Sequence, residues 1–583
     1  NGTPLQQSVR RRRQRQMRKR DTIDTTPHRG TMTTTRPQRP SPELVAEVQS
    51  WLDQDPDEAT RTELSDLLTR AQSGEAEAIA AVESAFAGPL TFGTAGLRAP
   101  LGPGPSRMNR IVVQRAAAGF AAWLRAHGHT GGSVVIGFDA RHNSEVFARD
   151  TAEIMAGAGF HALLADSPIP TPVTAFAIKH YGALAGVMVT ASHNPPTDNG
   201  YKVYLGDGSQ IVPPTDTEIA HEIEVVSKEP VGAIARGEDI EFIGEELIDA
   251  YVCRAAELTT ASPDVTWVYT AMHGVGTRVV RRLVEKAGLP EFIGVTEQLD
   301  PDPDFPTVAF PNPEEPGAID LAVAQARTHN ADVVIASDPD ADRCAVAAVI
   351  DGDWRMLTGD ELGTLLGDDA LRRGLDGVYA NSVVSSTCLG RMARAAKREY
   401  RVTLTGFKWI GRVPGLVFGY EEAIGYCCDP SHVPDKDGIT ALAKILRLVG
   451  ELKASGTTIA ERLDEIWATH GLHRTSQLAV RVTDMSIISE AMGRLRNQPP
   501  TTLLGDRVDV CDLNDPSNGS GLPQQNAIEL TGPRIHVATR PSGTEPKLKC
   551  YLEVRATPAE ASPELAPTQP GLHPPRATRR EAR

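Results

Sequence analysis

The 583-residue sequence has no run of about 18 apolar residues, which excludes a hydrophobic transmembrane helix. Its basic beginning is not followed by an apolar segment, so we predict no secretory signal peptide. The seven cysteines include one adjacent pair, Cys427 and Cys428, and no C-x-x-C spacing. An odd number of cysteines without metal-ligand spacing argues against a disulfide framework. We therefore expect a protein of the reducing cytoplasm, with no membrane partner.

The net charge of −15 is distributed unevenly along the chain. Residues 1–40 contain eleven Lys and Arg and two Asp, a balance of +9, so the rest of the chain is strongly acidic. The basic stretch at residues 10–20 allows two interpretations, a nucleic-acid-binding arm or nuclear signal, and a disordered tail. We favour the tail, because the sequence after Met32 has the pattern of a natural N-terminus followed by a helix.

The last segment, residues 558–583, contains six prolines and no apolar periodicity. Such a composition cannot bury enough apolar surface to fold, so we predict a second disordered tail. Neither tail carries a recognisable binding motif beyond its charge, and we predict no nucleic-acid partner.

The hydrophobic pattern between the tails predicts helices first and an alternation of strands and helices afterwards. Apolar residues recur at helical spacing over residues 42–87. From residue 88 to about 350, short β-branched runs alternate with helical stretches, which is typical of mixed or parallel sheets covered by helices. The alternation restarts near residues 266 and 378. Residues 473–557 show alternating strands around one amphipathic helix, which predicts an antiparallel sheet.

The predicted fold class is α/β, with three successive α/β domains and a C-terminal α+β domain. The predicted boundaries are a disordered basic tail at 1–41, domain 1 at 42–240, domain 2 at 241–352, domain 3 at 353–472, domain 4 at 473–557, and a proline-rich tail at 558–583. Ligands of parallel α/β sheets bind beyond the carboxyl ends of the strands, so polar clusters at those ends are the candidate sites.

The first cluster follows the apolar run at residues 186–189 and contains Ser192. A plain loop serine and a hydrolase nucleophile are the alternatives, but the G-x-S-x-G pattern of the latter is absent. A phosphoryl carrier explains more, because His193 and Lys202 stand close by in sequence to relay a proton or offset charge. Pro195 and Pro196 stiffen the loop.

The second cluster, DPDADR at residues 338–343, places Asp338, Asp340 and Asp342 at alternate positions after an apolar strand. Three such close carboxylates repel one another unless a cation is present, which favours Mg²⁺ over a solvated acidic turn. An EF-hand is disfavoured, because no glutamate occupies the twelfth loop position. Arg343 follows directly and is placed to contact a phosphate.

The third cluster, TRPSGTEPKLK at residues 539–549, collects a guanidinium, two hydroxyls, a glycine and an ammonium in one loop: Arg540, Ser542, Gly543, Thr544 and Lys547. These donors match a phosphate better than they match a plain hairpin turn.

Weaker signals are single charged residues on glycine-rich turns or at strand ends. Glu421 and Glu422 lie in GYEEAIGY, where carboxylates can accept hydrogen bonds from sugar hydroxyls. Lys408 lies in GFKWIGR, Arg98 in FGTAGLR and Arg141 in GFDARHNS.

The motifs TASHNP with a lysine ten residues after the serine, DPDADR, GYEEAIGY and RPSGTEPK occur in this order. Together they resemble the α-D-phosphohexomutase superfamily of phosphoglucomutases and phosphomannomutases, over about residues 42–557. The helical lead before FGTAGLR, GFKWIG and EEAIGY are most similar to its phosphoglucomutase-2/phosphopentomutase branch. The resemblance implies four domains in a heart-shaped molecule with a central active-site cleft.

The resemblance also implies a role for each matching residue. Ser192 would be the phosphoserine and, with Asp338, Asp340 and Asp342, a Mg²⁺ ligand. His193, Lys202, Arg98 and Arg343 would surround the transferred phosphate. The substrate-binding residues would be Lys408, Glu421, Arg540, Ser542, Gly543, Thr544 and Lys547. A sugar bisphosphate, such as glucose 1,6-bisphosphate, would be the intermediate and activator.

The implied activity is interconversion of hexose 1-phosphate and hexose 6-phosphate, with glucose as the first expectation. Phosphomannomutase and phosphopentomutase are the alternatives within the family, and a sugar-bisphosphate synthase or phosphatase those outside it. We expect a monomer or weak homo-oligomer. Two departures stand out: Ala423 replaces a serine that many members have after the sugar-binding glutamate, and the helix that usually closes domain 4 is not apparent, which would weaken that domain.

Overall fold

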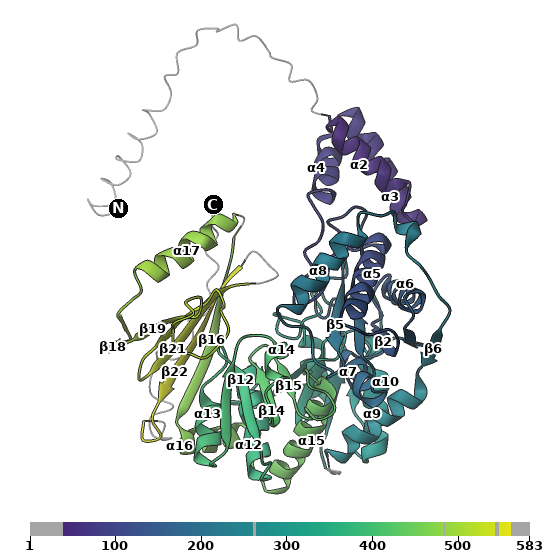
Figure 1. Cartoon of the computed structure of the whole chain (residues 1–583). Coiled ribbons are helices and arrows are strands. Elements are labelled where there is room, and N and C mark those ends of the chain that lie inside the picture. Colours follow the sequence, from purple (N-terminus) through teal and green to yellow (C-terminus); the bar gives the residue numbers. More distant parts are fainter. Residues whose placement is uncertain (1–38, 260–263, 483, 543–546, 561–583) are drawn as a thin grey trace, which may run out of the picture.

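The computed structural model describes residues 39–259, 264–482, 484–542 and 547–560. Four sheets follow one another along an open arc, and the first and last units lie at its two ends (Figure 1). None of the helices in these residues is long and apolar enough to cross a membrane. The predicted tails, 1–41 and 558–583, lie almost entirely outside the described residues.

Three helices precede the first sheet, as the periodicity of residues 42–87 predicted: α2 (Pro42–Leu52), α3 (Glu58–Ser73) and α4 (Ala76–Ala85). The Ser41 side chain caps α2 by accepting the backbone N–H of Leu44, and Pro42 occupies the first turn. Their apolar faces form one cluster, which also includes Ile111 and Val231 of the first α/β unit. The helices are therefore part of that unit's packing.

The first sheet has the strand order β1-β5-β4-β2-β3-β6. Its strands are β1 (Leu97–Pro100), β2 (Ser133–Phe138), β3 (His161–Ala165), β4 (Ala185–Val189), β5 (Asp198–Leu205) and β6 (Ile240–Ile243). Its helices are α5 (Arg110–Ala126), α6 (Ser144–Gly157), α7 (Thr171–His180) and α8 (Thr215–Val226), followed by the 3₁₀ turn η1 (Val231–Ala233). β4, β2, β3 and β6 are parallel, whereas β5 and β1 add antiparallel pairs.

The second sheet has the order β11-β10-β9-β7-β8. It contains β7 (Trp267–Thr270), β8 (Ile293–Gly294), β9 (Val333–Ser337), β10 (Cys344–Ile350) and β11 (Asp353–Met356). Its helices are α9 (Glu245–Glu257), α10 (Gly276–Ala287), α11 (Asp320–His329) and the 3₁₀ turn η2 (Thr296–Gln298). β7 is parallel to β8 and β9, and β10 turns back antiparallel to β9.

The third sheet has the order β13-β12-β14-β15. Its strands are β12 (Val378–Ser382), β13 (Glu399–Thr403), β14 (Leu416–Glu421) and β15 (Gly425–Cys427). Its helices are α12 (Gly359–Arg372), α13 (Cys388–Ala395), α14 (Phe407–Ile410), α15 (Gly438–Ala454) and α16 (Ile459–His470). The first three sheets are thus mixed, and one continuous core cluster runs through all three units.

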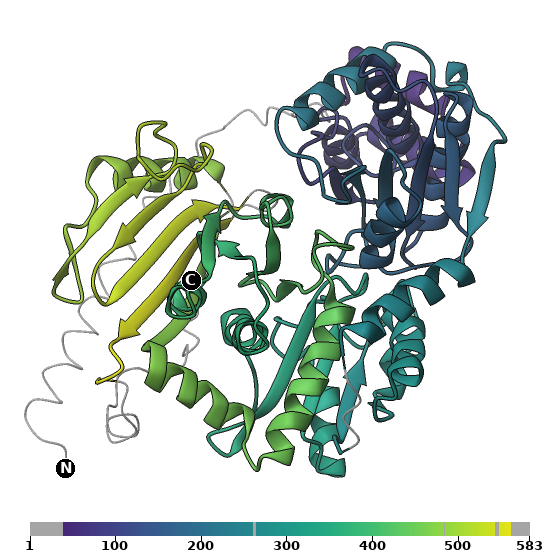
Figure 2. The ribbon, with the colours of Figure 1, turned by 60° about the horizontal axis from the view of Figure 1, so that its bottom comes forward.

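The fourth sheet is fully antiparallel, in the order β16-β22-β21-β20-β19, as its alternating sequence predicted. Its strands are β16 (Leu472–Arg481), β19 (Asp509–Asp512), β20 (Ile528–Thr531), β21 (Ile535–Pro541) and β22 (Lys547–Ala556). The amphipathic helix α17 (Met485–Asn497) packs on it, and a small hairpin joins β17 (Thr502–Leu503) to β18 (Asp506–Arg507). Figure 2 shows that this unit lies on the opposite side of the molecule from the first sheet.

Candidate functional site

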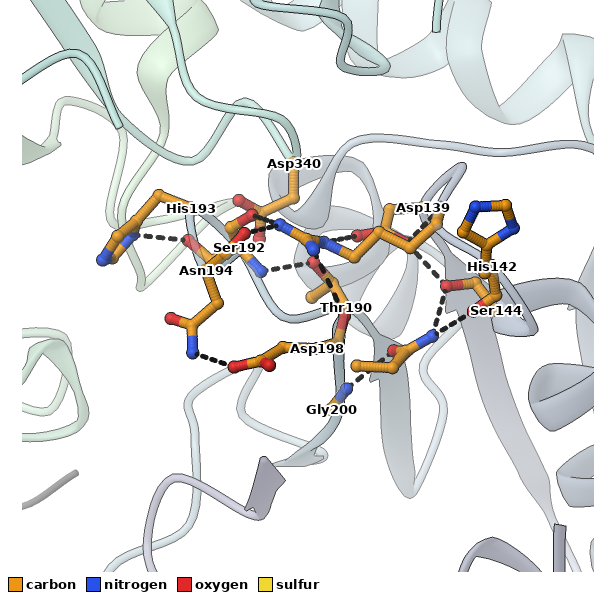
Figure 3. A network of polar contacts seen from close by, with 12 residues as sticks. Asp139, His142, Ser144, Thr190, Ser192, His193, Asn194, Asp198, Gly200 and Asp340 are labelled. Atoms are coloured by element: carbon orange, nitrogen blue, oxygen red, sulfur yellow. Dashed lines mark hydrogen bonds and ion pairs between the residues drawn. The ribbon is translucent and has the colours of Figure 1, made fainter. Parts of the chain in front are cut away.

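The loop after β4 carries Ser192 in a strained position, with φ of 52°, and the side chain is only 2% exposed. The Ser192 amide donates to Thr190 Oγ1 at 2.8 Å, which helps to hold this left-handed turn. The Ser192 hydroxyl donates to Asp338 Oδ2 at 2.9 Å. It also lies 3.2 Å from His193 Nδ1 (Figure 3). The carboxyl ends of β4 and β9 therefore meet, and two predicted clusters form one site.

The loop between β9 and β10 buries three aspartates, Asp338, Asp340 and Asp342, and a carboxylate oxygen of each lies within 4.8 Å of the others. Asp340 Oδ2 accepts a hydrogen bond from Thr171 Oγ1 at 2.6 Å. Asp340 Oδ1 and Asp342 Oδ1 are buried and find no hydrogen-bond partner among the described residues. An all-oxygen donor set with such orphaned carboxylate oxygens fits a hard divalent cation such as Mg²⁺.

Lysine and arginine side chains surround these carboxylates. Lys202 Nζ lies 2.8 Å from Asp340 Oδ2 and 3.1 Å from Asp342 Oδ2, and the Arg343 guanidinium lies 3.7 Å from Asp342. Burial opposes the charge of Lys202, but the two aspartates outweigh burial and raise its pKa. Lys202 is thus an ammonium group here.

The carboxylates respond to burial and to one another. Burial, together with the charges of Asp340 and Asp342, raises the pKa of Asp338 well above its usual range. Burial acts in the same direction on Asp342, but Lys202, Lys436 and Arg343 outweigh it and lower the pKa of that carboxyl.

His193 differs from Lys202 in its protonation. Burial, reinforced by Arg343 and Arg98, holds the pKa of His193 well below its ordinary value, so its imidazole is neutral near pH 7. A neutral ring 3.2 Å from the Ser192 hydroxyl can accept a proton. Arg98 joins the same group by donating to Asn194 Oδ1 at 3.2 Å. All residues predicted around the transferred phosphate are thus brought together.

Lys436 also belongs to this group, although none of the sequence motifs predicted it. Its Nζ lies 3.3 Å from Asp342 Oδ2, and the side chain stands over the Phe407 ring. The next residue, Asp437, caps α15 through the N–H groups of Ile439 and Thr440. A lysine directly before a helix-capping aspartate is the only signal in the sequence, and such a lysine is usually solvated.

The two glutamates of GYEEAIGY have different hydrogen-bond partners in the protein. Glu421 Oε1 accepts the backbone N–H of Gly406 at 2.6 Å, whereas Glu422 Oε2 accepts Ser382 and Ser385 hydroxyls at 3.2 Å. Burial raises the pKa of both carboxyls, and the charge of Glu422 reinforces the effect on Glu421. Ala423 occupies the position at which many family members have a serine, and its backbone carbonyl accepts a hydrogen bond from Arg343 at 3.1 Å.

Lys408 reaches across from the third unit to the first and donates to the Thr94 hydroxyl in the FGTAGLR loop. Burial lowers the pKa of Lys408, Asp216 and Glu421 oppose this, and the charge of Arg540 adds to it. Arg540 of the fourth unit is therefore close enough to Lys408 to affect its protonation. Among the described residues, the Arg540 Nε donates to its neighbour, the Pro541 carbonyl, at 3.3 Å.

The rest of the predicted phosphate loop is described only at its base, where the Ser542 amide donates to the Lys547 carbonyl at 2.8 Å. Gly543 and Thr544 lie outside the described residues. The structure thus collects the catalytic candidates in one place, and brings Lys408, Glu421 and Arg540 near one another on the side of the third and fourth units.

A buried serine hydroxyl beside an acidic oxygen cluster, ringed by lysine and arginine, is typical of an enzyme of phosphoryl transfer. The comparisons with known proteins agree. Three models of phosphoglucomutase/phosphomannomutase α/β/α domains match in order: domain I at residues 89–229, domain II at 249–349 and domain III at 358–470.

Several named proteins are similar over most of their length. A Haemophilus influenzae protein named "probable phosphomannomutase" is 46% identical over 80% of this chain and 97% of its own. The Homo sapiens phosphopentomutase is 34% identical over 89% of this chain and 93% of its own. The parafusin of Paramecium, a phosphoglucomutase solved in an open form, shares the fold with a TM-score of 0.64 at 18% identity, covering 80% of this chain and 90% of that one.

The chain belongs to the phosphoglucomutase/phosphomannomutase family of the α-D-phosphohexomutases. It is a phosphosugar mutase, an isomerase that transfers a phosphoryl group within a sugar phosphate.

Proposed function

We propose that this protein interconverts hexose 1-phosphate and hexose 6-phosphate through a phosphorylated Ser192, with glucose phosphates as the first substrate to test. The observation that carries the proposal is the 2.9 Å contact between the Ser192 hydroxyl and Asp338 in a buried setting. A serine that stores a phosphoryl group beside a cation site needs this proximity, and a structural loop serine does not.

The residues around Ser192 act on protons and charge. Phosphoserine 192 gives its phosphoryl group to the free hydroxyl of the bound sugar phosphate, and His193 accepts the proton of that hydroxyl. Between the two bases considered for this step, the lowered pKa of His193 favours the imidazole over the Lys202 ammonium. The resulting bisphosphate then reorients in the site so that its other phosphate faces Ser192, and the Ser192 hydroxyl accepts that phosphoryl group.

Asp338, Asp340 and Asp342 would hold Mg²⁺, with an oxygen of residue 192 as a further ligand, and the ion would neutralise the charge of the phosphoryl oxygens. Lys202, Arg98 and Arg343 offset the remaining phosphate charge from the protein side. Lys202 is buried with the carboxylates, and the half-buried Arg98 and Arg343 cover them further, which limits access of the water that would hydrolyse a phosphoserine.

The sugar is bound from the side of the third and fourth units. Glu421 and Lys408 would contact hydroxyl groups, and the loop with Arg540, Ser542, Gly543, Thr544 and Lys547 would bind the phosphate that is not transferred. The contact of Lys408 with Thr94 supports this assignment, because it brings the sugar side against the unit that carries Ser192.

A pentose 1-phosphate is the second candidate substrate. Relatives named phosphoribomutase and phosphopentomutase align over 89% of this chain, more than the 80% covered by the relative named phosphomannomutase. The hydroxyl that Ala423 cannot offer is one contact by which a hexose and a pentose would be distinguished.

The deciding experiment is a coupled isomerisation assay on glucose, mannose, ribose and deoxyribose 1-phosphates, with Mg²⁺ and trace glucose 1,6-bisphosphate. We expect turnover of a hexose phosphate, and none from Ser192→Ala even when bisphosphate is added. Release of inorganic phosphate at the rate of isomer formation would indicate a phosphatase. Bisphosphate accumulation with a bisphosphoglycerate donor would indicate a synthase.

We further propose that the protein works in the cytoplasm as a monomer or weak homo-oligomer. The seven cysteines are all free thiols, as expected for a reducing compartment. Gel filtration with light scattering at several concentrations tests the oligomeric state, and a stable tetramer would contradict it.

A further inference from the structure

Arg141 lies at the end of β2, next to the loop that carries Ser192, and only 4% of the residue is exposed. We propose that Arg141 is a positioning residue, which fixes the main chain of the Ser192 loop in the conformation needed for phosphoryl transfer. The inference rests on the proposed role of Ser192 as the carrier. Arg141 does not touch the Ser192 hydroxyl in this role; it acts on the backbone that presents it.

One guanidinium binds four backbone carbonyls of the same loop. Its Nη2 donates to the carbonyls of Ser192 and Asn194, both at 2.6 Å. Its Nη1 donates to those of Pro195 at 2.8 Å and Asp198 at 3.2 Å. The backbone of the loop from Ser192 to Asp198 is therefore bound at four residues by a single guanidinium group.

Arg141 is itself held rigidly. Asp139 Oδ1 accepts the Ser144 hydroxyl at 2.6 Å (Figure 3). The same oxygen accepts the Arg141 backbone N–H at 3.0 Å, and Asp139 Oδ2 lies 3.4 Å from Arg141 Nε. On another side, the guanidinium stacks over the Phe305 ring, with 4.9 Å between Cζ and the ring centre. Phe305 belongs to the second unit, so Arg141 also links the loop to the unit that carries the aspartates.

This arrangement explains how a strained serine is maintained. A non-glycine residue at φ of 52° persists only where its surroundings fix it, and the Ser192 carbonyl is bound by Arg141 while its amide is bound by Thr190. Without the guanidinium, each of the four carbonyls would lose one donor, although the Pro195 carbonyl would keep the Asp198 amide, and the loop would relax toward other conformations. The Ser192 hydroxyl would then leave its position beside Asp338.

A lysine cannot substitute for this geometry. Its ammonium is a compact point charge with three donors, whereas the planar guanidinium spreads its donors over a fork that reaches separate acceptors. Arg141→Lys therefore keeps the charge and most of the volume but loses the simultaneous grip on the loop. This separates positioning from simple electrostatics.

The test compares Arg141→Lys and Arg141→Ala with Arg110→Lys as the matched control. Arg110 also forms a bidentate ion pair in the first unit, with Asp150 at 2.7 and 2.8 Å, but does not contact the Ser192 loop. We expect kcat of Arg141→Lys to fall about 100-fold, with KM changed less than about threefold, because a misplaced reacting group lowers the chemical step most. Arg110→Lys should keep wild-type kcat.

Chemical rescue provides the readout that a merely structural role would not move. Added guanidinium ion should restore kcat of Arg141→Ala by about tenfold or more at concentrations that leave wild type folded, because a free guanidinium can occupy the vacated position. If Arg141→Ala does not fold, Arg141→Lys alone decides by its kcat and by phosphorylation of Ser192, measured by intact mass after bisphosphate priming.

Wild-type kcat in folded Arg141→Lys would overturn the inference, as would loss of kcat in Arg110→Lys of the same size. The two proposals fail in distinguishable ways. If wild-type protein is never phosphorylated on Ser192, the proposed function itself fails. If wild type is phosphorylated and active while Arg141→Lys matches it, only the role of Arg141 is wrong.

Discussion

The Lys436 ammonium lies 3.3 Å from Asp342 Oδ2, so the third unit supplies a cation to the acidic loop of the second. The same two units are joined at this point by backbone contacts, because the Cys344 amide donates to the Ile424 carbonyl at 3.2 Å. The negative charge of the acidic loop is thus offset in part by a lysine from another unit.

Removal of the Lys436 charge should impair activity. Lys436→Met leaves a buried carboxylate with less compensation, so we expect kcat/KM to fall about 10- to 100-fold. Lys453→Met is the control, because Lys453 pairs with Asp332 at the surface and is 37% exposed. Steady-state kinetics with a saturating activator measures both. Equal activity of the two variants would show that Lys202 and Arg343 suffice.

Asp340→Asn should weaken the response to Mg²⁺. The substitution preserves volume and removes one anionic ligand, so the Mg²⁺ concentration for half-maximal activity should rise about tenfold or more. Asp353→Asn, which alters an exposed carboxylate paired with Arg327, serves as the control. A Mg²⁺ titration of both variants is decisive, and an unchanged midpoint in Asp340→Asn would remove Asp340 from the metal site.

Arg540→Ala should act mainly on substrate binding. The Arg540 side chain lies near Lys408 and Glu422, and among the described residues its hydrogen bond goes to the Pro541 carbonyl of its own loop, which leaves its other N–H groups for a phosphate. We expect KM to rise about tenfold or more while kcat changes little, because the bound phosphate is not the one transferred. A fall in kcat at constant KM would place Arg540 in the chemical step.

Glu553 should make the junction of the third and fourth units sensitive to acid. Its buried carboxylate accepts hydrogen bonds from Ser386 Oγ at 2.6 Å, from the Thr387 amide and hydroxyl at 2.8 Å each, and lies 2.8 Å from His473 Nδ1. Burial opposes ionisation, but these partners outweigh it and lower the pKa of Glu553 to about 2. The pKa is therefore lower in the folded protein than in the unfolded chain.

A carboxyl whose pKa is lower in the folded state stabilises that state at pH values above its unfolded pKa of 4.5. This stabilisation is lost as the pH falls toward the folded pKa of about 2. At pH 7, Glu553→Gln should therefore reduce the free energy of unfolding by about 3 kcal/mol. The difference between variant and wild type should shrink below about pH 4.5. Urea unfolding at pH 7, 5 and 3.5 measures it, and a difference that grows on acidification would contradict the assignment.

The order of elements and most of the transferred-phosphate site could be predicted from the sequence, because strand ends, glycine turns and ordered motifs mark them locally. Ser192, Asp338 and Lys202 fall into this class. The resemblance implied that Ser192 and Asp338 lie together as ligands of one Mg²⁺, and in the structure a hydrogen bond of 2.9 Å joins them. The strand-end rule alone could not predict this contact, because β4 and β9 belong to different sheets.

Other features could not be predicted, because they depend on which distant segments meet. Lys436 is an ordinary lysine until the third unit packs against the second. The neighbouring Glu421 and Glu422 look equivalent in sequence, yet strand β14 ends between them and sends them to different partners. Arg141 shows no sign in sequence that it will bind four carbonyls of a loop that begins 51 residues later.

The continuous hydrophobic core through the first three units contrasts with the fourth unit, which has its own cluster beneath α17 and shares only a small cluster, around Val383 and Tyr551, with the third. Buried apolar surface is the main source of cooperativity, so a shared core should melt as one block. Because the cluster shared by the third and fourth units is small, differential scanning calorimetry of the intact chain should resolve a small transition for the C-terminal unit beside a larger one for the rest. In thermodynamic terms the molecule would then consist of two cooperative blocks, the first three units and the fourth. Any movement of the fourth unit over the sugar would hinge at the junction between these blocks.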